Sequence, residues 1–372
     1  MTSSITMFRR ILLLLVPIAI VANALRLGPQ IVFVAAFLAL IPLASLLTEA
    51  TEELAIRTGP RIGGLLNATL GTMTELIIMF ALLRSGQIHL LKASIVGSIL
   101  ISLLFTVGVA VLFGGIRNGM QRFDRHSVGL ATTTMILAVV GLLVPTLFSF
   151  VVELQQHAPI TADFQNRSVN EISVAVAVIL FLLYLLTVVY QLRAPEGEGL
   201  TQERRCSTSE KGSWSMGRTL AVLGVATIGI AVVGEMLSGS VQPFGATLGL
   251  SHLFLGVVIL PVAGAISELI VCVQMARNNQ VNLALSIPMN GAMQVPLFVA
   301  PLLVFLSAFS PAPLTLYFSI VEVIAVAIAV ALAAYIAIDG VTSWLEGAQL
   351  LALWGILALW FYFYDPVPGL TL

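Results

Sequence analysis

Two apolar stretches decide the fold: residues 65–78 read LLNATLGTMTELII, and residues 259–271 read ILPVAGAISELIV. Each stretch carries one glutamate, Glu75 in the first and Glu268 in the second. An ionisable side chain at bilayer depth costs about 2.5 to 3.5 kcal/mol on insertion scales. A chain that places two glutamates in matching apolar surroundings therefore indicates a protein that binds or moves cations.

The composition is that of a polytopic membrane protein. Of the 372 residues, 59% are hydrophobic and 9% are charged, and the mean hydropathy is +1.05. Ordinary soluble domains carry about 25% charged residues. The net charge of −1 predicts no nucleic-acid partner, and the two cysteines have no metal-ligand spacing and cannot build a disulfide framework. We expect no resident cofactor and no enzymatic activity.

Apolar runs long enough to span a bilayer, about 20 residues each, occur eleven times. They cover residues 11–25, 30–56, 61–84, 88–115, 127–154, 170–193, 218–240, 245–277, 281–309, 313–338 and 343–364. The predicted fold class is all-α, a polytopic membrane protein with 11 transmembrane helices. The predicted division is an N-terminal transmembrane helix (1–29), a first repeat (30–193, helices 2–6), a cytoplasmic linker (194–217) and a second repeat (218–372, helices 7–11).

The N-terminus is compatible with two interpretations. Arg9-Arg10 followed by the apolar run 11–22 is the layout of a cleavable signal and also of a first transmembrane helix. We favour the helix, because bacterial-type polytopic proteins need no cleaved signal and the topology uses this helix well.

The positive charges predict the orientation. An N-terminus in the cytoplasm puts thirteen Lys and Arg residues on cytoplasmic segments and four (Arg26, Arg84, Lys92 and Arg167) on outside segments. The positive-inside rule favours this arrangement. It places the C-terminus outside. We expect an integral protein of a bacterial inner (plasma) membrane, whose partners are the lipid bilayer, inorganic cations and protons; the sequence does not predict an oligomeric state.

The chain repeats itself at an offset of 193 residues. This offset maps Glu75 onto Glu268 and Arg84 onto Arg277. The segment with Glu75 is predicted helix 3, and the segment with Glu268 is predicted helix 8, five helices later. Because five is an odd number, the two repeats have opposite orientations in the membrane. Transporters built from inverted repeats bind their substrates near the bilayer midplane. Each glutamate lies nine residues before an arginine, about 13 Å along a helix, so both carboxylates are expected at similar depth.

Glu75 and Glu268 are the predicted cation-binding and proton-binding groups, and the only predicted metal ligands of carboxylate type. Two carboxylates neutralise one divalent cation, and hard cations such as Ca²⁺ prefer oxygen ligands. Without a cation, the two desolvated carboxylates repel each other and favour protonation. Protons and a cation then compete for the same groups, which is the basis of an antiporter. The alternative is that each glutamate is a structural group bonded to the backbone.

The neighbouring residues extend this interpretation. Glycine and proline near both glutamates indicate broken helices with free carbonyl oxygens, or close helix packing through small residues. Polar side chains are available as additional ligands, the alternative role being hydrogen bonds between helices. Those candidates are Thr72, Thr74, Ser98, Ser102, Ser267, Asn290 and Gln294.

Other acidic residues have two interpretations each. Three glutamates lie at the cytoplasmic end of the second apolar run: Glu49, Glu52 and Glu53. One interpretation is a funnel that attracts cations, and the other is a solvated helix end whose carboxylates pair with arginine. Two more acids lie inside apolar runs, Glu235 and Glu322, and are interpreted either as proton relays or as partners of polar groups.

Several motifs occur along nearly the whole chain: IPLASLLTEATEELA (41–55), TGP (58–60), GGLLNAT (63–69), KASIVGSIL (92–100), Gln294 with LFVAP (297–301), and Asp339-Gly340 with WLEG (344–347). In this order they resemble the calcium/proton exchangers, the cation-exchanger branch of the calcium/cation antiporter superfamily. The resemblance implies eleven helices, an inverted five-helix repeat after the first helix, and proton-driven movement of Ca²⁺, with Glu75 and Glu268 as central carriers.

The sequence departs from the family pattern at the ion site. The family usually has Gly-Asn-Ala-Thr-Glu where this chain has residues 71–75, and Gly-Asn-Ala-Ala-Glu-His where it has residues 264–269. Ser102 replaces a usual asparagine, and Asn290 replaces a usual glycine. Fewer amide ligands lower the coordination number, which weakens Ca²⁺ binding or changes ion choice unless water, hydroxyls or Asn290 substitute.

The sequence therefore predicts a secondary antiporter that exchanges protons for a divalent cation, with Ca²⁺ as the expected ion, by alternating access. One alternative is an exchanger of the same fold with altered selectivity, for Na⁺, Mn²⁺ or another cation. The other is a transport-inactive paralogue that acts as a membrane scaffold or sensor.

Overall fold

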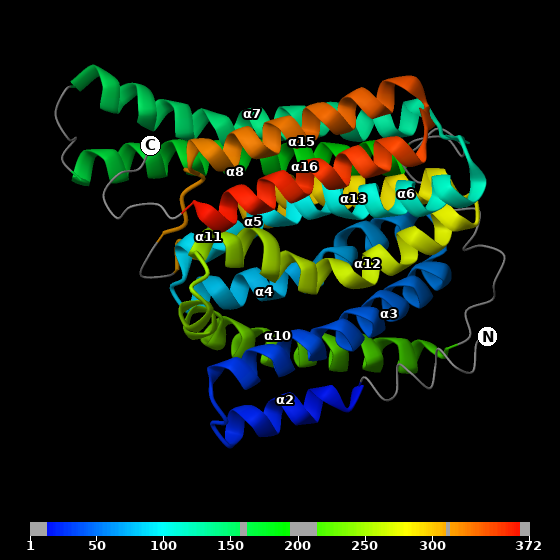
Figure 1. Ribbon diagram of the computed structural model, residues 1–372, viewed down its shortest axis with the longest axis horizontal. Coiled ribbons are helices and arrows are strands. Elements are labelled where there is room, and N and C mark those ends of the chain that lie inside the picture. Colours follow the sequence, from blue (N-terminus) through cyan, green and yellow to red (C-terminus); the bar gives the residue numbers. More distant parts are fainter. Residues whose placement is uncertain (1–12, 157–161, 194–213, 310–312, 365–372) are drawn as a thin grey trace.

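The computed structural model describes residues 13–156, 162–193, 214–309 and 313–364 (Figure 1). In these ranges the chain is a bundle of long helices with one short two-stranded ladder, so the predicted all-α class is confirmed. The start of the predicted first helix and the linker 194–213 lie outside the described residues.

The elements follow one another with few irregular residues between them. The helices of the first half are α2 (Leu15–Ala24), α3 (Pro29–Gly71), α4 (Met73–Arg84), α5 (Ile88–Leu100), the π-helix η1 (Ile101–Thr106), α6 (Val107–Asn118), α7 (Arg125–Gln156) and α8 (Ala162–Arg193). Those of the second half are α10 (Met216–Leu248), α11 (His252–Phe254), η2 (Leu255–Ile259), α12 (Leu260–Arg277), α13 (Val281–Gln294), η3 (Val295–Val299), α14 (Ala300–Ser307), α15 (Ile320–Asp339) and α16 (Trp344–Phe363). Strands β1 (Gln121–Arg122) and β2 (Val341–Thr342) pair antiparallel.

Within the described ranges, nine helices are long and apolar enough to cross a bilayer. The predicted count of eleven stays a prediction. Helix α2 has only ten described residues, and the segment that contains Glu75 is interrupted at Thr72, which leaves α4 with twelve residues.

Helix α3 is not one straight rod. A Cβ atom on Gly63 would strike the main chain of Ala55, eight residues earlier. Eight residues of a straight α-helix advance about 12 Å, so the chain turns back on itself between these positions. Glycine is required at position 63 because no side chain fits between the two arms. The first arm, Pro29–Thr58, is the one long enough to span.

The helix boundaries repeat at the offset seen in the sequence. Adding 193 to Ile88, the first residue of α5, gives Val281, the first residue of α13, and adding it to Arg84, the last residue of α4, gives Arg277, the last residue of α12. Two of the three π-helices in the described ranges follow the same rule, because η1 maps onto residues 294–299 and η3 covers Val295–Val299. A π-helix is rare and adds a residue to a turn, so its recurrence at the same place strengthens the repeat.

The α5–η1–α6 segment lies at the centre of the bundle. In the most apolar window of Ile88–Asn118, 83% of residues are buried, against 17% for Trp344–Phe363 at the periphery. Figure 1 shows α4, α5, α12 and α13 in the middle, with α2, α3 and α10 along one edge and α7 and α15 along the other. Close packing at this centre positions the ion site.

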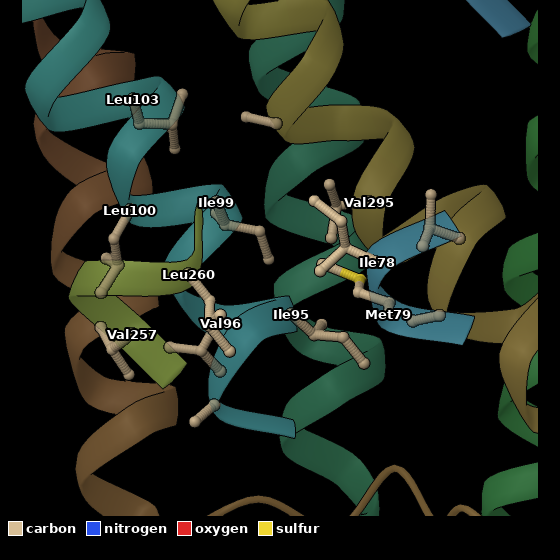
Figure 2. Close-up of a cluster of buried hydrophobic side chains, with 14 of the residues drawn as sticks. Ile78, Met79, Ile95, Val96, Ile99, Leu100, Leu103, Val257, Leu260 and Val295 are labelled. Carbon is tan, nitrogen blue, oxygen red and sulfur yellow. The ribbon is translucent and has the colours of Figure 1, made fainter. Parts of the chain in front are cut away.

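Two glycines let α5 and η2 cross with their main chains in contact. A Cβ on Gly97 would lie 2.6 Å from Val257 Cα and 2.7 Å from Pro261 Cγ, and one on Gly256 would strike Ala93. Around this crossing, Val96 and Leu100 lie beside Val257 and Leu260 (Figure 2). Small residues that allow such approach are typical of membrane helix interfaces.

Hydrogen bonds tie the loops together at each end of the bundle. At one end β1 pairs with β2, and the Gln121 amide donates to the carbonyl of Ala276 over 3.0 Å. At the other end Gln87 donates to the carbonyl of Ser238 over 2.7 Å, and Ser251 donates to that of Phe361 over 2.8 Å. If successive helices cross the bilayer in alternating directions, the segments joined at each end lie on the same side of the membrane.

Several predicted helix boundaries were wrong: the break predicted between residues 56 and 61 lies inside α3, and α11 begins at His252 rather than at residue 245. Helix α10 continues past residue 240 to Leu248 with Pro243 inside it, because Phe244 stacks on Phe33 with ring centroids 4.1 Å apart. Helix α15 begins at Ile320 rather than at 313, because Ser319 and Glu322 form a capping box there.

Candidate functional site

The fold brings Glu75 and Glu268 together from opposite repeats. Glu75 lies in the first turn of α4, and Glu268 lies in the middle of α12. Both side chains are partly buried, and the charges of the two carboxylates act on each other. A carboxylate in the first turn of a helix is stabilised by the positive end of the helix dipole. The two groups therefore form one doubly acidic site.

Each glutamate rests on a glycine. A Cβ on Gly264 would lie 3.0 Å from Glu75 Cγ, and a Cβ on Gly291 would lie 3.3 Å from Glu268 Oε1. The glycines make room for the carboxylates, and Gly264 lies inside the unbroken helix α12. The predicted helix break occurs in the first repeat only, at Thr72, whose φ and ψ of −92° and 6° separate α3 from α4.

A hydrogen bond between the repeats lies next to this pair. The hydroxyl of Thr72 donates to Gln294 Oε1 over 3.2 Å, and both residues are buried. Gln294 therefore contacts Thr72, and one lone pair of its side-chain carbonyl oxygen accepts this hydrogen bond; its role as a ligand stays a prediction. Ser98, on α5, faces the Glu75 carboxylate without a hydrogen bond of standard geometry.

The remaining candidate ligands lie on the helices that build the site. Thr74 is buried in α4 and Ser102 is buried in η1, whereas Ser267 on α12 and Asn290 on α13 are partly exposed. Ser267 adjoins Glu268 and Asn290 adjoins Gly291 in the chain. Across the described residues, no three His, Cys, Asp or Glu side chains form a cluster that could hold a metal. A bound cation would therefore need hydroxyl, amide or water oxygens beside the two carboxylates.

The second acidic group, Glu49, Glu52 and Glu53, lies on α3, more than twenty residues before Glu75 in the sequence. Glu53 accepts a hydrogen bond from the backbone N–H of Trp214 over 3.4 Å, and the Arg218 guanidinium lies over the Trp214 ring at 4.7 Å. Glu52 is exposed and Glu49 is partly buried. Glu53 therefore contacts the residues that lead into α10, and the cation funnel stays a prediction.

Glu235 does not join Glu75 and Glu268. It lines a separate cavity of about 580 Å³ between α2, α3 and α10, together with Asn23 and Arg26. Glu322 lies apart as well, because its carboxylate accepts a hydrogen bond from Ser319 N over 2.8 Å and completes the cap of α15. Of its two interpretations, pairing with polar groups matches these contacts.

Lys92 is a charge inside an apolar run that the sequence analysis placed on an outside segment. It is partly buried within α5, donates to Thr315 Oγ1 over 2.9 Å and to the carbonyl of Tyr317 over 2.7 Å, and interacts with the charge of Glu322. A lysine four residues inside an apolar run needs such partners, which was the available signal. Lys92 fastens the non-helical residues before α15 to the central helix.

Comparisons with known proteins agree with this arrangement. The family model described as sodium/calcium exchanger protein matches residues 29–193 and 218–363. The chain is 37% identical over 369 residues to a protein named Ca(2+)/H(+) antiporter from Aphanothece halophytica, with 96% of each chain covered. It is 33% identical to Ca(2+)/H(+) antiporter ChaA from Bacillus subtilis, with 93% of this chain and 96% of that protein covered.

A solved structure has the same fold. The structure of native YfkE superposes with a TM-score of 0.78 at 30% identity, covering 96% of this chain and 100% of that one. The family model therefore matches both halves of this chain, including the segments that carry Glu75 and Glu268. The chain belongs to the sodium/calcium exchanger protein family.

Proposed function

We propose that this protein is a secondary antiporter that exchanges protons for Ca²⁺ by alternating access. The observation that carries the proposal is the meeting of Glu75 and Glu268 from opposite repeats, each seated on a glycine, with interacting charges. The relatives named Ca(2+)/H(+) antiporter support the choice of ion and of coupling.

The chemistry follows from competition for the two carboxylates. A divalent cation neutralises both charges at once, and protons neutralise them when the cation leaves. Protonation from the outside releases the cation there, and deprotonation towards the cytoplasm restores the site. A state in which neither ligand is bound leaves two repelling charges inside the bundle, which disfavours the empty site and couples the two fluxes.

The orientation and the division of the chain belong to the same proposal. The distribution of Lys and Arg supports a cytoplasmic N-terminus, an outside C-terminus and a bacterial inner membrane. Residues 30–193 and 218–372 would then be the two repeats, with 194–217 as a cytoplasmic linker.

The test uses purified protein in proteoliposomes with an imposed pH gradient and a panel of Ca²⁺, Mn²⁺ and Na⁺. We expect ⁴⁵Ca²⁺ uptake that depends on the gradient and collapses with a protonophore. Liposomes without protein give the baseline. Gradient-driven uptake of Mn²⁺ or Na⁺ with no uptake of Ca²⁺ would contradict the choice of ion, and no flux of any cation would contradict transport itself.

Altered selectivity is the second candidate, and the Thr72–Gln294 hydrogen bond favours it. Thr72 and Ala265 stand where the family usually has amides, and the Gln294 oxygen is engaged by Thr72. Amide oxygens are ordinary Ca²⁺ ligands. The double variant Thr72→Asn with Ala265→Asn is expected to lower the Ca²⁺ concentration for half-maximal uptake by about tenfold, equivalent to about 1.4 kcal/mol.

Concentration dependence of ⁴⁵Ca²⁺ uptake measures this effect. Thr72→Val is the matched control, because it removes the hydroxyl and adds no amide oxygen. An unchanged half-maximal concentration in the double variant, with transport retained, would show that hydroxyl or water ligands already complete the site.

A further inference from the structure

Four hydroxyl side chains are spaced four residues apart along the central segment: Ser94, Ser98, Ser102 and Thr106. We call them the hydroxyl row. In an α-helix, four residues turn about 40° more than one full turn, so side chains spaced by four slowly rotate around the helix axis. Ser102 and Thr106 lie in the π-helix η1. A π turn contains more residues, so there four residues make less than a full turn and the side chains rotate in the opposite direction. The π-helix therefore keeps the four positions on one side of the segment.

Three of the four hydroxyls of this row lack the partners that other helical hydroxyls have. Ser94, Ser98 and Thr106 are at most 2% exposed, and no group in the described part of the chain forms a standard hydrogen bond with their Oγ atoms. Elsewhere the hydroxyls of Thr51, Thr146 and Ser240 bond the carbonyl four residues earlier. That back-bond is the usual solution in a helix. A buried hydroxyl without it needs another polar partner.

The row runs past Glu75. Ser98 faces the Glu75 carboxylate, whose charge also interacts with that of Glu268. The row spans residues 94–106, a rise of about 18 Å along an α-helix. Ile95 and Ile99 point towards Ile78 and Met79 on α4, and Val96 and Leu100 point the other way, so apolar side chains flank the row (Figure 2). Other charged groups lie beyond its outer end, where Lys92 interacts with Glu322 and His89 with His252.

The second repeat has no such row. The positions offset by 193 are Ile287, Gly291, Val295 and Val299, which carry no hydroxyl. The π-helix is nevertheless present there as η3. The local geometry therefore does not require hydroxyls, and their presence is particular to the helix that faces Glu75.

We propose that the hydroxyl row holds a file of water molecules that conducts protons to and from Glu75, and that Glu268 has no equivalent path. This inference rests on the proposed proton exchange. Each hydroxyl accepts one hydrogen bond and donates another, so a proton moves along the file without any change in the number of atoms or electrons. The two carboxylates are then unequal, and Glu75 is the one that exchanges protons with the solvent through the row.

Two fluxes in proteoliposomes separate this role from cation binding. Uptake of ⁴⁵Ca²⁺ driven by a pH gradient needs proton transfer, whereas exchange of ⁴⁵Ca²⁺ for unlabelled Ca²⁺ at equal pH does not. Ser94→Ala and Thr106→Val are expected to slow the first flux by about a hundredfold, the lower end of the range for loss of a proton-transfer group, and to leave the second unchanged. Ser94→Thr and Thr106→Ser keep a hydroxyl and are expected to keep both fluxes.

Ser240→Ala is the matched control, since it removes a buried hydroxyl that bonds its own helix. Equal loss of both fluxes in Ser94→Ala would overturn the proposal and make the row structural or cation-binding. Unchanged gradient-driven uptake in both variants would overturn it as well. Should Thr106→Val fail to stay monodisperse, Ser94→Ala against Ser94→Thr decides alone. Absence of gradient-driven uptake in the unmodified protein would instead contradict the proposed function.

Discussion

Glu75→Gln and Glu268→Gln are each expected to reduce pH-gradient-driven ⁴⁵Ca²⁺ movement in inverted vesicles to the level of vesicles without the protein. Glutamine has the same size as glutamate and fits in the same space beside Gly264 or Gly291. It carries neither the negative charge that binds a cation nor the exchangeable carboxyl proton. Because each carboxylate supplies half of the charge that neutralises a divalent ion, neither glutamate can replace the other.

Glu346→Gln is the control for these variants. Glu346 accepts a hydrogen bond from Ser343 N over 2.9 Å in the capping box of α16, away from the site. Glutamine preserves that acceptor, so transport should be unaffected. Full transport in either Glu75→Gln or Glu268→Gln would contradict the mechanism.

Gly97→Ala is expected to have the largest effect on stability. The added Cβ would lie 2.6 Å from Val257 Cα and 2.7 Å from Pro261 Cγ, so the main chains of α5 and η2 must separate. Overpacking of a close-packed interior costs about 1–3 kcal/mol and occasionally more. The separation would also displace Ser98 from Glu75. A lower midpoint of thermal unfolding in detergent, followed by size-exclusion chromatography of heated samples, measures the effect.

Gly224→Ala makes the same chemical change with the opposite expectation. Gly224 is exposed in the interior of α10, and a Cβ there would meet nothing within 4 Å. Alanine favours a helix more than glycine does, so the midpoint should stay the same or rise. Equal midpoints for Gly97→Ala and Gly224→Ala would show that α5 and η2 do not cross as closely as described.

The sequence was sufficient to predict the helical class and the partnership of the two glutamates. Glu75 and Glu268 stand out because charges inside apolar runs are rare, and their common offset implied that the repeats would bring them together. The structure places them at one site. Gln294 and Thr72 were both predicted as additional ligands; the structure joins them by a hydrogen bond, and their role as ligands stays a prediction.

The sequence could not predict features that depend on contacts between distant segments. Residues 313–319 are apolar enough to read as helix, yet they are held extended because Ser173 and Thr146 accept hydrogen bonds from the N–H groups of Leu316 and Phe318. Lys92 could be flagged as costly, but its partners lie more than 220 residues away in the chain. The reversal inside α3 similarly depends on one contact between Ala55 and Gly63.

The bond between Thr72 and Gln294 also has a consequence for biosynthesis. Its partners are 222 residues apart, so at about 5–20 residues per second the ribosome needs roughly 10–45 s to make the second after the first. Glu75 therefore enters the membrane long before Gly264, Glu268 and Gln294 exist. During that interval Glu75 has no partner from the second repeat. The pair of glutamates therefore forms only when the second repeat packs against the first, late in biosynthesis.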